Sequence, residues 1–224
     1  ADAKMRMFNA DGSEGSMAGN ALRCMAKYLY DNGIVRKEEM TLETDKGTKT
    51  VRVYTTDGRV TSACVDMGYA TLDTTALRLN IPKRQVVNYP VEIAGQPWEI
   101  TCVDMGNPHC VVFCSRVDGV DVARIGPQFE HAPYFPDRIN TEFIRVVNPS
   151  TIKMRVWERG SGETLACGTG ACAAVVAAGA NGLCEKGRDI TVRVQGGDLV
   201  VHYTDEAVTL TGDAKLVYTG VVEY

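Results

Sequence analysis

The residues best suited to chemistry gather around one cysteine. Cys167 lies in Glu163-Thr-Leu-Ala-Cys-Gly-Thr-Gly170, directly before a predicted helix. A helix N-terminus offers unpaired N–H groups and a partial positive charge, which lower the pKa of a cysteine and favour a thiolate that acts as base or nucleophile. The same N–H groups can bind a substrate carboxylate beside that thiolate. Taken alone, a buried structural thiol before a glycine-rich turn explains this cysteine more simply.

Three further polar residues are predicted at strand ends. His109 follows a strand in the turn Met105-Gly-Asn-Pro-His109, and Glu158 and Arg159 end the strand that leads into the Cys167 loop. The imidazole and the carboxylate can hold or relay protons, and the guanidinium can bind a carboxylate through two parallel hydrogen bonds. Singly, these are compatible with a satisfied turn histidine and a solvated ion pair. Together, around an activated thiol, they predict an acid–base site.

An internal repeat indicates which elements position these residues. Lys4-Met-Arg-Met-Phe-Asn9 is similar to Lys153-Met-Arg-Val-Trp-Glu158, at an offset of 149 residues. The same offset pairs the Asn-Gly at 32–33 with the Asn-Gly at 181–182. Each copy is predicted to contain a strand, a Gly/Ser-rich turn and a helix that ends at a glycine. The sequence therefore predicts one supersecondary unit used twice.

The two predicted helices differ in polarity. In the first, Leu22, Met25, Ala26 and Leu29 form an apolar stripe. The second, at 171–180, is apolar all round and should be enclosed by other structure.

The rest of the chain is predicted to form short strands joined mostly by hairpins, at 41–65, 85–103, 110–114, 190–194, 199–203 and 207–211. Few helices and many strands indicate an α+β fold. With the repeat, this predicts two pseudo-symmetric halves, each a curved, mostly antiparallel sheet around a central helix. We assign residues 1–70 with 213–224 to the first half and 71–212 to the second.

Composition narrows the class of protein. The chain has 224 residues, is 45% hydrophobic and 23% charged, and carries a net charge of −4. It is long enough for one or two cored domains, and the composition excludes disorder and collagen-like repeats. The longest apolar run, at 171–180, is too short to cross a membrane. The absence of Lys/Arg clusters argues against nucleic acid or an anionic membrane as partner.

The cysteines indicate a reducing, cytoplasmic setting. Eight are present and no C-x-x-C pair occurs, which argues against zinc and thioredoxin sites. A metal bound by His109, Cys110 and Cys114 is the less favoured alternative, because the run from 110 to 114 is apolar and buried cysteine is an ordinary small hydrophobe. We expect neither a metal nor a cofactor.

Five motifs, in order along the chain, resemble diaminopimelate epimerase: Phe8–Glu14, Met17–Asn20, Met105–His109, Phe135–Asn140 and Trp157–Gly170. The resemblance implies a cofactor-independent amino-acid racemase or epimerase of two α+β halves, with its site in the cleft between them. It implies diaminopimelate as the small-molecule partner and is compatible with a homodimer. The family interconverts the LL and meso forms of 2,6-diaminopimelate, for lysine and cell-wall synthesis. It uses two cysteines, of which one thiolate removes the α-proton and the opposite thiol returns one.

By position, Cys167 resembles one of those cysteines, and His109 and Glu158 match the polar residues that assist the pair. Glu158 also belongs to the substrate-binding positions. The other positions that match substrate-binding residues are Asn9, Gly19, Asn20, Asn107, Asn140, Arg159, Gly168 and Thr169.

The chain departs from the family pattern at the second cysteine. Ala18 stands there, and the repeat pairs it with Cys167. Cys24 is no substitute, because six residues along a helix add about 9 Å of rise and leave it about 120° short of two full turns. We therefore expect either an inactivated form or altered chemistry.

The beginning of the chain is the second departure. The repeat would place the counterpart of Asn107 about forty residues before Ala1. We therefore expect the first half to be incomplete and the gene product to be longer.

Three alternatives remain open at this point. One is a racemase of another amino acid, such as histidine, on the same fold. A phenazine-biosynthesis-type isomerase is less favoured, because Cys167 would have little purpose there. The third is a catalytically inactive amino-acid-binding homologue.

Overall fold

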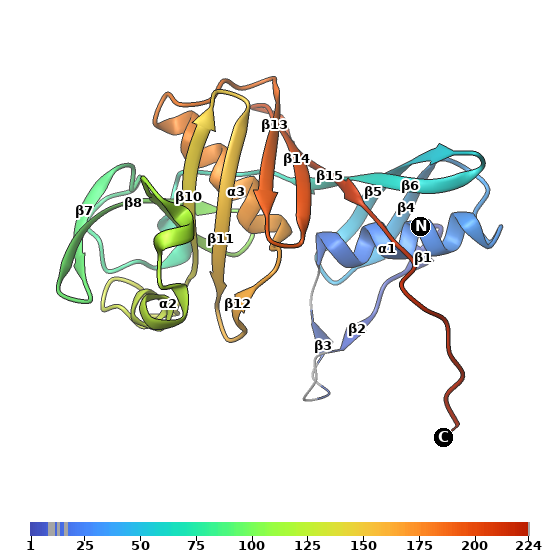
Figure 1. Cartoon of the computed structure of the whole chain (residues 1–224), viewed down its shortest axis with the longest axis horizontal. Coiled ribbons are helices and arrows are strands. Elements are labelled where there is room, and N and C mark those ends of the chain that lie inside the picture. The colour runs from blue at the N-terminus through green and yellow to red at the C-terminus, as the bar shows by residue number, and fades with distance from the viewer. Residues whose placement is uncertain (9–11, 13, 16–17, 224) are drawn as a thin grey trace. The chain divides into compact units, whose positions relative to one another are not determined.

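The computed structural model describes residues 1–8, 12, 14–15 and 18–223, and it divides into two compact units (Figure 1). The first contains Ala1–Asp66 and Thr211–Tyr224, and the second contains Met67–Leu210. The chain enters the second unit within β6 (Arg59–Gly68) and returns within β15 (Val208–Asp213). We describe each unit by itself.

The first unit is a small sheet with one helix. Its strand order is β1-β4-β5-β6, in which β1 and β4 are parallel and the other pairs antiparallel. The bounds are β1 (Ala3–Lys4), β4 (Glu39–Thr44) and β5 (Gly47–Thr56), with β2 (Met7–Phe8) and β3 (Glu14–Gly15) forming a separate hairpin. Helix α1 (Gly19–Asp31) packs against β5 and buries Leu22, Ala26 and Leu29 of the predicted stripe, whereas Met25 is half-buried.

The second unit has a larger mixed sheet. Its order is β14-β13-β11-β10-β9-β8-β7, with β12 on β11, and only the pairs β9–β10 and β11–β13 are parallel. The bounds are β7 (Tyr89–Ile93), β8 (Gln96–Asp104), β9 (Pro108–Phe113), β10 (Asn140–Asn148), β11 (Thr151–Glu158), β12 (Gly162–Thr164), β13 (Asp189–Val194) and β14 (Gly197–Tyr203).

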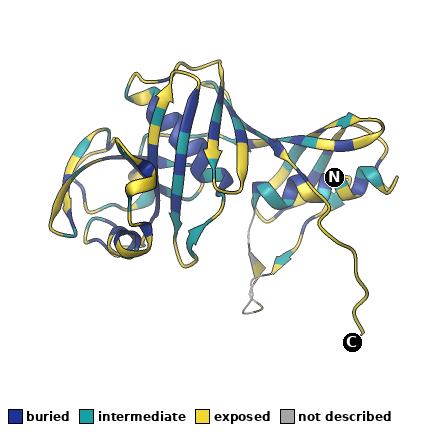
Figure 2. Ribbon diagram, in the orientation of Figure 1, coloured by how far each residue is buried: buried dark blue, intermediate teal, exposed yellow. Residues whose placement is uncertain are grey.

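Helix α3 (Gly168–Ala180) is the centre of the second unit. It contacts β8 to β11, β13 and β14, and its residues from Gly170 to Ala178 are all buried (Figure 2). Its small side chains allow strands to approach it closely from several sides. The prediction of an enclosed helix is confirmed.

The two units repeat one design. Helices α1 and α3 each have 13 residues at the offset of 149, and each is followed by a glycine with positive φ, Gly33 at 68° and Gly182 at 72°. The hairpin β2–β3 pairs Phe8 with Glu14, and β11–β12 pairs the residues 149 positions later, Trp157 with Glu163. The α+β fold of two similar halves is confirmed.

A third helix, α2 (Val122–Glu130), is absent from the sequence-based prediction, which assigns no element to this segment. Its N-cap Asp121 accepts a hydrogen bond from the Arg124 N–H, and Val122, Ile125 and Phe129 are buried. Two single-turn helices, Thr75–Leu77 and Val117–Gly119, are further additions. Gly126 and Pro127 interrupt the helical pattern in the sequence, which explains the omission.

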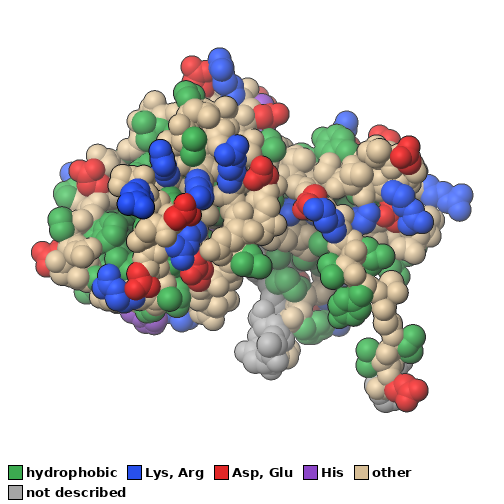
Figure 3. All heavy atoms as spheres, in the orientation of Figure 1, with side chains coloured by type: hydrophobic (Ala, Val, Ile, Leu, Met, Phe, Trp, Pro, Cys, Tyr) green, Lys and Arg blue, Asp and Glu red, His purple; other side chains and the backbone are tan. Residues whose placement is uncertain are grey.

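The surface of the second unit carries mixed charge. On the face seen in Figure 3, Lys and Arg side chains lie over β10, β11 and β13 with acidic side chains among them. One such contact joins Lys153 to Asp118 at 2.6 Å. Among the described residues, no helix combines the length and apolar character needed to cross a bilayer.

Candidate active site

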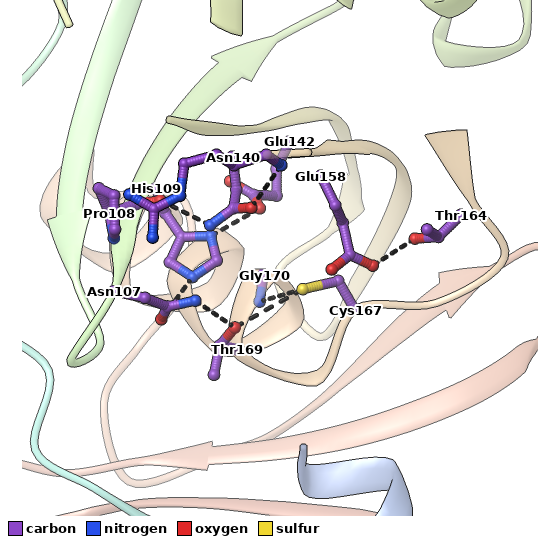
Figure 4. A network of polar contacts seen from close by, with 11 residues as sticks. Asn107, Pro108, His109, Asn140, Glu142, Glu158, Thr164, Cys167, Thr169 and Gly170 are labelled. Carbon is purple, nitrogen blue, oxygen red and sulfur yellow. Dashed lines mark hydrogen bonds and ion pairs between the residues drawn. The ribbon is translucent and has the colours of Figure 1, made fainter. Parts of the chain in front are cut away.

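Cys167 is the N-cap residue of α3 (Figure 4). Its Sγ accepts a hydrogen bond from the Gly170 N–H at 3.4 Å and lies 3.6 Å from the Thr169 hydroxyl oxygen. Only 7% of the residue is exposed. The thiol therefore takes the capping place that Ser, Thr, Asp or Asn usually fills.

The ionisation of Cys167 is opposite to the expectation from its helix terminus. Burial raises the pKa of the thiol to about 12, and the negative charges of Glu158 and Glu142 add to the increase. Hydrogen bonds from Thr169 and Gly170 lower the pKa, but they are outweighed. Desolvation and two nearby carboxylates thus overcome the helix N-terminus, and the free protein holds a neutral thiol.

His109 is the second residue of β9 and is fully buried, so its predicted place in a turn is wrong. The turn ends at Asn107, two residues before His109, because Pro108 already pairs with Asp104 of β8. The imidazole Nδ1 lies 2.7 Å from Oε1 of Glu142, and Nε2 lies 3.0 Å from Oδ1 of Asn107. The ring is therefore fixed from both sides.

Asn107 connects the imidazole to the start of α3. Its Nδ2 donates to the Thr169 hydroxyl at 3.3 Å, and that hydroxyl contacts the Cys167 thiol. Polar contacts thus run without interruption from Glu142 through His109, Asn107 and Thr169 to Cys167 (Figure 4).

Glu142 is a site residue that sequence reasoning missed. It lies on β10, two residues after Asn140, and none of its side chain is exposed. Burial raises the pKa of its carboxyl, whereas the charge of His109 and the hydrogen bond to it lower that pKa. The available signal is a carboxylate in a segment rich in β-branched and aromatic residues, with Phe143 and Ile144 directly after it.

Glu158 and Arg159 lie where the strand pattern predicts them, at the end of β11. The Thr164 hydroxyl donates to Oε1 of Glu158 at 2.5 Å, and the half-buried Glu158 side chain reaches toward the Cys167 thiol (Figure 4). Arg159 is exposed, and its Nη1 donates to the Asp137 carbonyl at 3.1 Å.

Asn140 connects the start of β9 to the end of β11. Its Nδ2 donates to the Pro108 carbonyl and its Oδ1 accepts from the Arg159 N–H, both at 2.8 Å. The buried carboxylate of Glu130, on α2, holds the β11–β12 hairpin in place. It accepts hydrogen bonds from the Trp157 indole and the Gly160 N–H. These contacts fix the backbone that carries Glu158 and Arg159.

The alternative metal site is not assembled. Among the residues that the structure describes, no group of three or more His, Cys, Asp or Glu side chains is placed to hold a metal ion. His109 and Cys110 are neighbours in β9, so their side chains point to opposite faces of the sheet.

The remaining predicted site residues belong to the first unit. Ala18 is the N-cap residue of α1 and has no side-chain capping bond, and Gly19 and Asn20 are the first two helical residues. Asn9 lies outside the described residues. The structure therefore gathers Cys167, Gly168, Thr169, His109, Asn107, Asn140, Glu158 and Arg159 in the second unit.

The fold is shared with solved structures of a probable proline racemase, a hydroxyproline epimerase and a phenazine biosynthesis protein. A probable proline racemase from Agrobacterium radiobacter K84 superposes with a TM-score of 0.71 at 16% identity, covering 99% of this chain and 72% of that one. A hydroxyproline epimerase from Agrobacterium vitis gives 0.71 at 13% identity, covering 96% and 69%. A PhzF-family phenazine biosynthesis protein from Bacillus anthracis gives 0.66 at 13% identity, covering 95% and 78%.

Sequence comparison specifies the family within that fold. Residues 1–72 and 101–217 match the family model described as diaminopimelate epimerase. The diaminopimelate epimerase of Desulfovibrio desulfuricans is 50% identical over 98% of this chain and 79% of its own length. That of Acetivibrio thermocellus is 47% identical over 100% and 80%. The chain belongs to the diaminopimelate epimerase family, a family of isomerases.

Proposed function

We propose that the chain moves the α-proton of 2,6-diaminopimelate through Cys167. The observation that carries this proposal is the position of that thiol, at the N-cap of α3 and at the end of the polar contacts from Glu142. The family of the chain supports the substrate. We also propose that it acts in the cytoplasm as a homodimer, in lysine biosynthesis.

Cys167 must lose its proton before it can act as a base. Because burial and two carboxylates keep the free thiol neutral, a positively charged α-ammonium group is needed nearby to favour the thiolate. The thiol proton passes to the Glu158 carboxylate, which faces it. The thiolate then takes the α-hydrogen: the C–H bond breaks, an S–H bond forms, and the electron pair spreads into the substrate carboxylate.

The start of α3 is suited to that developing charge. The N–H groups of Gly168 and Thr169 lie in the first turn and are not used by the Cys167 cap, which takes the Gly170 N–H. They can donate to a substrate carboxylate as it gains negative charge. Arg159 is available for the carboxylate at the distal end.

Ala18 limits what this chain does. With no thiol at the start of α1, one base serves one face of the α-carbon, so we propose proton exchange without efficient inversion. The same observation favours a second candidate function, binding of the amino acid without chemistry.

The test is α-proton exchange in D2O, followed by NMR for LL- and meso-diaminopimelate and for histidine. We expect exchange of diaminopimelate, its loss in Cys167→Ala, and gain of epimerisation in Ala18→Cys. Cys24→Ala, which removes an exposed thiol of α1, is the matched control and should behave like the parent.

Two results would contradict the proposal. Turnover of histidine but not diaminopimelate by Ala18→Cys would assign a different substrate. Binding of diaminopimelate without exchange in any variant would leave the amino-acid-binding function.

A further inference from the structure

We propose that Glu142 is a positioning residue that keeps two protons on His109 and thereby holds Asn107, and through it the start of α3, in a reactive arrangement. The inference rests on the proposed function, because the value of that arrangement is its effect on Cys167. Nothing in the sequence motifs that resemble the family assigned a role to Glu142.

The first step is the burial of the pair. The Glu142 and His109 side chains have no exposed area, and Oε1 and Nδ1 are 2.7 Å apart. Water cannot reach either group, so neither a lone carboxylate nor a lone imidazolium would be tolerated there. A proton between Nδ1 and Oε1 gives both groups a hydrogen-bond partner. When Nε2 carries a second proton, the imidazolium and the carboxylate together have no net charge.

The second step is the proton on Nε2. Asn107 turns its amide nitrogen to the Thr169 hydroxyl, so its oxygen faces Nε2 at 3.0 Å. An oxygen acceptor at that distance requires a proton on Nε2. Both ring nitrogens therefore face oxygen acceptors, and both act as donors. A bond between charged partners is also shorter and stronger than a neutral one.

The third step is the connection to Cys167. An amide does not relay protons easily, but it can fix the orientation of its hydrogen-bond partners. The Asn107 amide is itself held between Nε2 of His109 and the Thr169 hydroxyl. The Thr169 hydroxyl, which accepts from Asn107, lies 3.6 Å from Sγ of Cys167. Weakening the Glu142–His109 hydrogen bond should therefore also weaken the contacts from His109 to Asn107, from Asn107 to Thr169 and from Thr169 to the Cys167 thiol.

Among the described residues, the charged groups that act on Glu142 are His109 and Glu158. Three elements surround the Glu142 side chain. Strand β9 contributes His109, β11 contributes the charge of Glu158, and α3 contributes Gly170 in its first turn. A Cβ atom on Gly170 would lie 2.6 Å from Oε1, so the carboxylate fills the space beside that turn. The Oε2 atom has no hydrogen-bond partner among the described residues, so His109 carries the polar pairing of this side chain.

The direct test is 15N NMR of the histidine rings near neutral pH, in the parent and in Glu142→Gln. In the parent we expect protons on both ring nitrogens of His109 and a strongly downfield Nδ1–H signal. In the variant, Nε2 should keep its proton, whereas Nδ1 should lose its proton and accept from the new amide. Asp189→Asn is the matched control, because it changes a second histidine–carboxylate contact, at His202, that is exposed.

The functional test is α-proton exchange by Glu142→Gln. We expect kcat to fall about 10- to 100-fold, the range known for carboxylates that orient metal-binding histidines, with little change in KM. In an Asn107→Ala background the same substitution should cost much less, because its effect passes through Asn107. A purely structural role would give additive losses.

Several outcomes decide against the inference. An unprotonated Nε2 in the parent would overturn it, and this spectrum needs no variant, so a poorly folded Glu142→Gln leaves the test intact. An unchanged Nδ1 in the variant, or additive losses with Asn107→Ala, would also overturn it. If no amino acid exchanges at all, the proposed function fails, while the spectra still decide the protonation of His109.

Discussion

The starts of α1 and α3 have the same backbone and different chemistry. The N-cap residue has φ −137° and ψ 122° at Ala18, and φ −127° and ψ 116° at Cys167. Only Cys167 has a side chain that accepts a capping hydrogen bond. The comparison shows that the strand–turn–helix pattern determines the path of the chain, whereas a single side chain decides whether that path carries a reactive group.

The hairpins before the two helices differ in burial. Arg6 pairs with Glu14 at 2.9 Å, and Arg155 pairs with Glu163 at 2.7 Å, 149 residues later. The first pair is mostly exposed and the second largely buried. In the second unit α2 contacts β11 and β12, and the described part of the first unit has no counterpart of α2. The repeated motif becomes part of a core only where another element covers it.

The largest expected effect comes from the aromatic residue of each hairpin. Trp157 packs against the core of the second unit, with its indole N–H on Glu130, whereas Phe8 is 56% exposed. Trp157→Ala should lower the free energy of unfolding by about 3–5 kcal/mol, because it leaves a cavity and removes the indole hydrogen bond to Oε2 of the buried Glu130 carboxylate. Phe8→Ala should cost less than about 1 kcal/mol.

Chemical denaturation of both variants measures this difference. Glu130→Gln adds a useful comparison, because it keeps the shape of the Trp157 contact and removes only the charge. Equal losses for Trp157→Ala and Phe8→Ala would mean that α2 does not stabilise the second hairpin.

The third residue of each helix gives the next largest effect. It is Ala21 in α1 and Gly170 in α3, although alanine is the better helix former. The reason is the Glu142 carboxylate, which occupies the place of a Cβ atom at Gly170. Gly170→Ala should therefore destabilise the protein by about 1–3 kcal/mol, despite its favourable propensity.

Ala21→Gly is the matched control for that substitution. It should cost about 0.5–1 kcal/mol from backbone entropy alone. Thermal unfolding followed by circular dichroism checks both values. A stabilising Gly170→Ala would show that the Glu142 side chain moves aside at little cost.

The elements of the repeat could be predicted because their signals are local. The apolar stripe of α1, the apolar run of α3 and the terminal Asn-Gly pairs lie within single helices. Helix α2 could not be predicted as readily, because Gly126 and Pro127 weaken its pattern. The reason for Gly126 appears only in the folded structure, since a Cβ atom there would overlap the Trp157 ring.

The site could be predicted in part for the same reason. Cys167, His109, Glu158 and Arg159 were predicted from their places at the ends of helices and strands, and the resemblance to the family added Asn107 and Asn140. Glu142 gave no such signal, because its role depends on a pairing of parallel strands that sets Asn140 beside His109. The raised pKa of Cys167 also depends on burial and on carboxylates from other strands, which the helix-start motif does not contain.

The smallest expected effect tests the two helix starts directly, because Cys167→Ala gives α3 the same N-cap residue as α1. The pKa of the Cys167 thiol is about 12 in the folded protein and near 9.0 when unperturbed, so the unfolded chain loses this proton first. Stability from this group is therefore complete below about pH 9 and is lost as pH rises toward 12. Near pH 10 the loss should be about 1.4 kcal/mol relative to neutral pH. Urea denaturation should show that Cys167→Ala lacks this part of the alkaline destabilisation, while Cys24→Ala retains it. If parent and Cys167→Ala follow the same alkaline curve, the thiol has an unshifted pKa, and the helix N-terminus offsets the effect of burial.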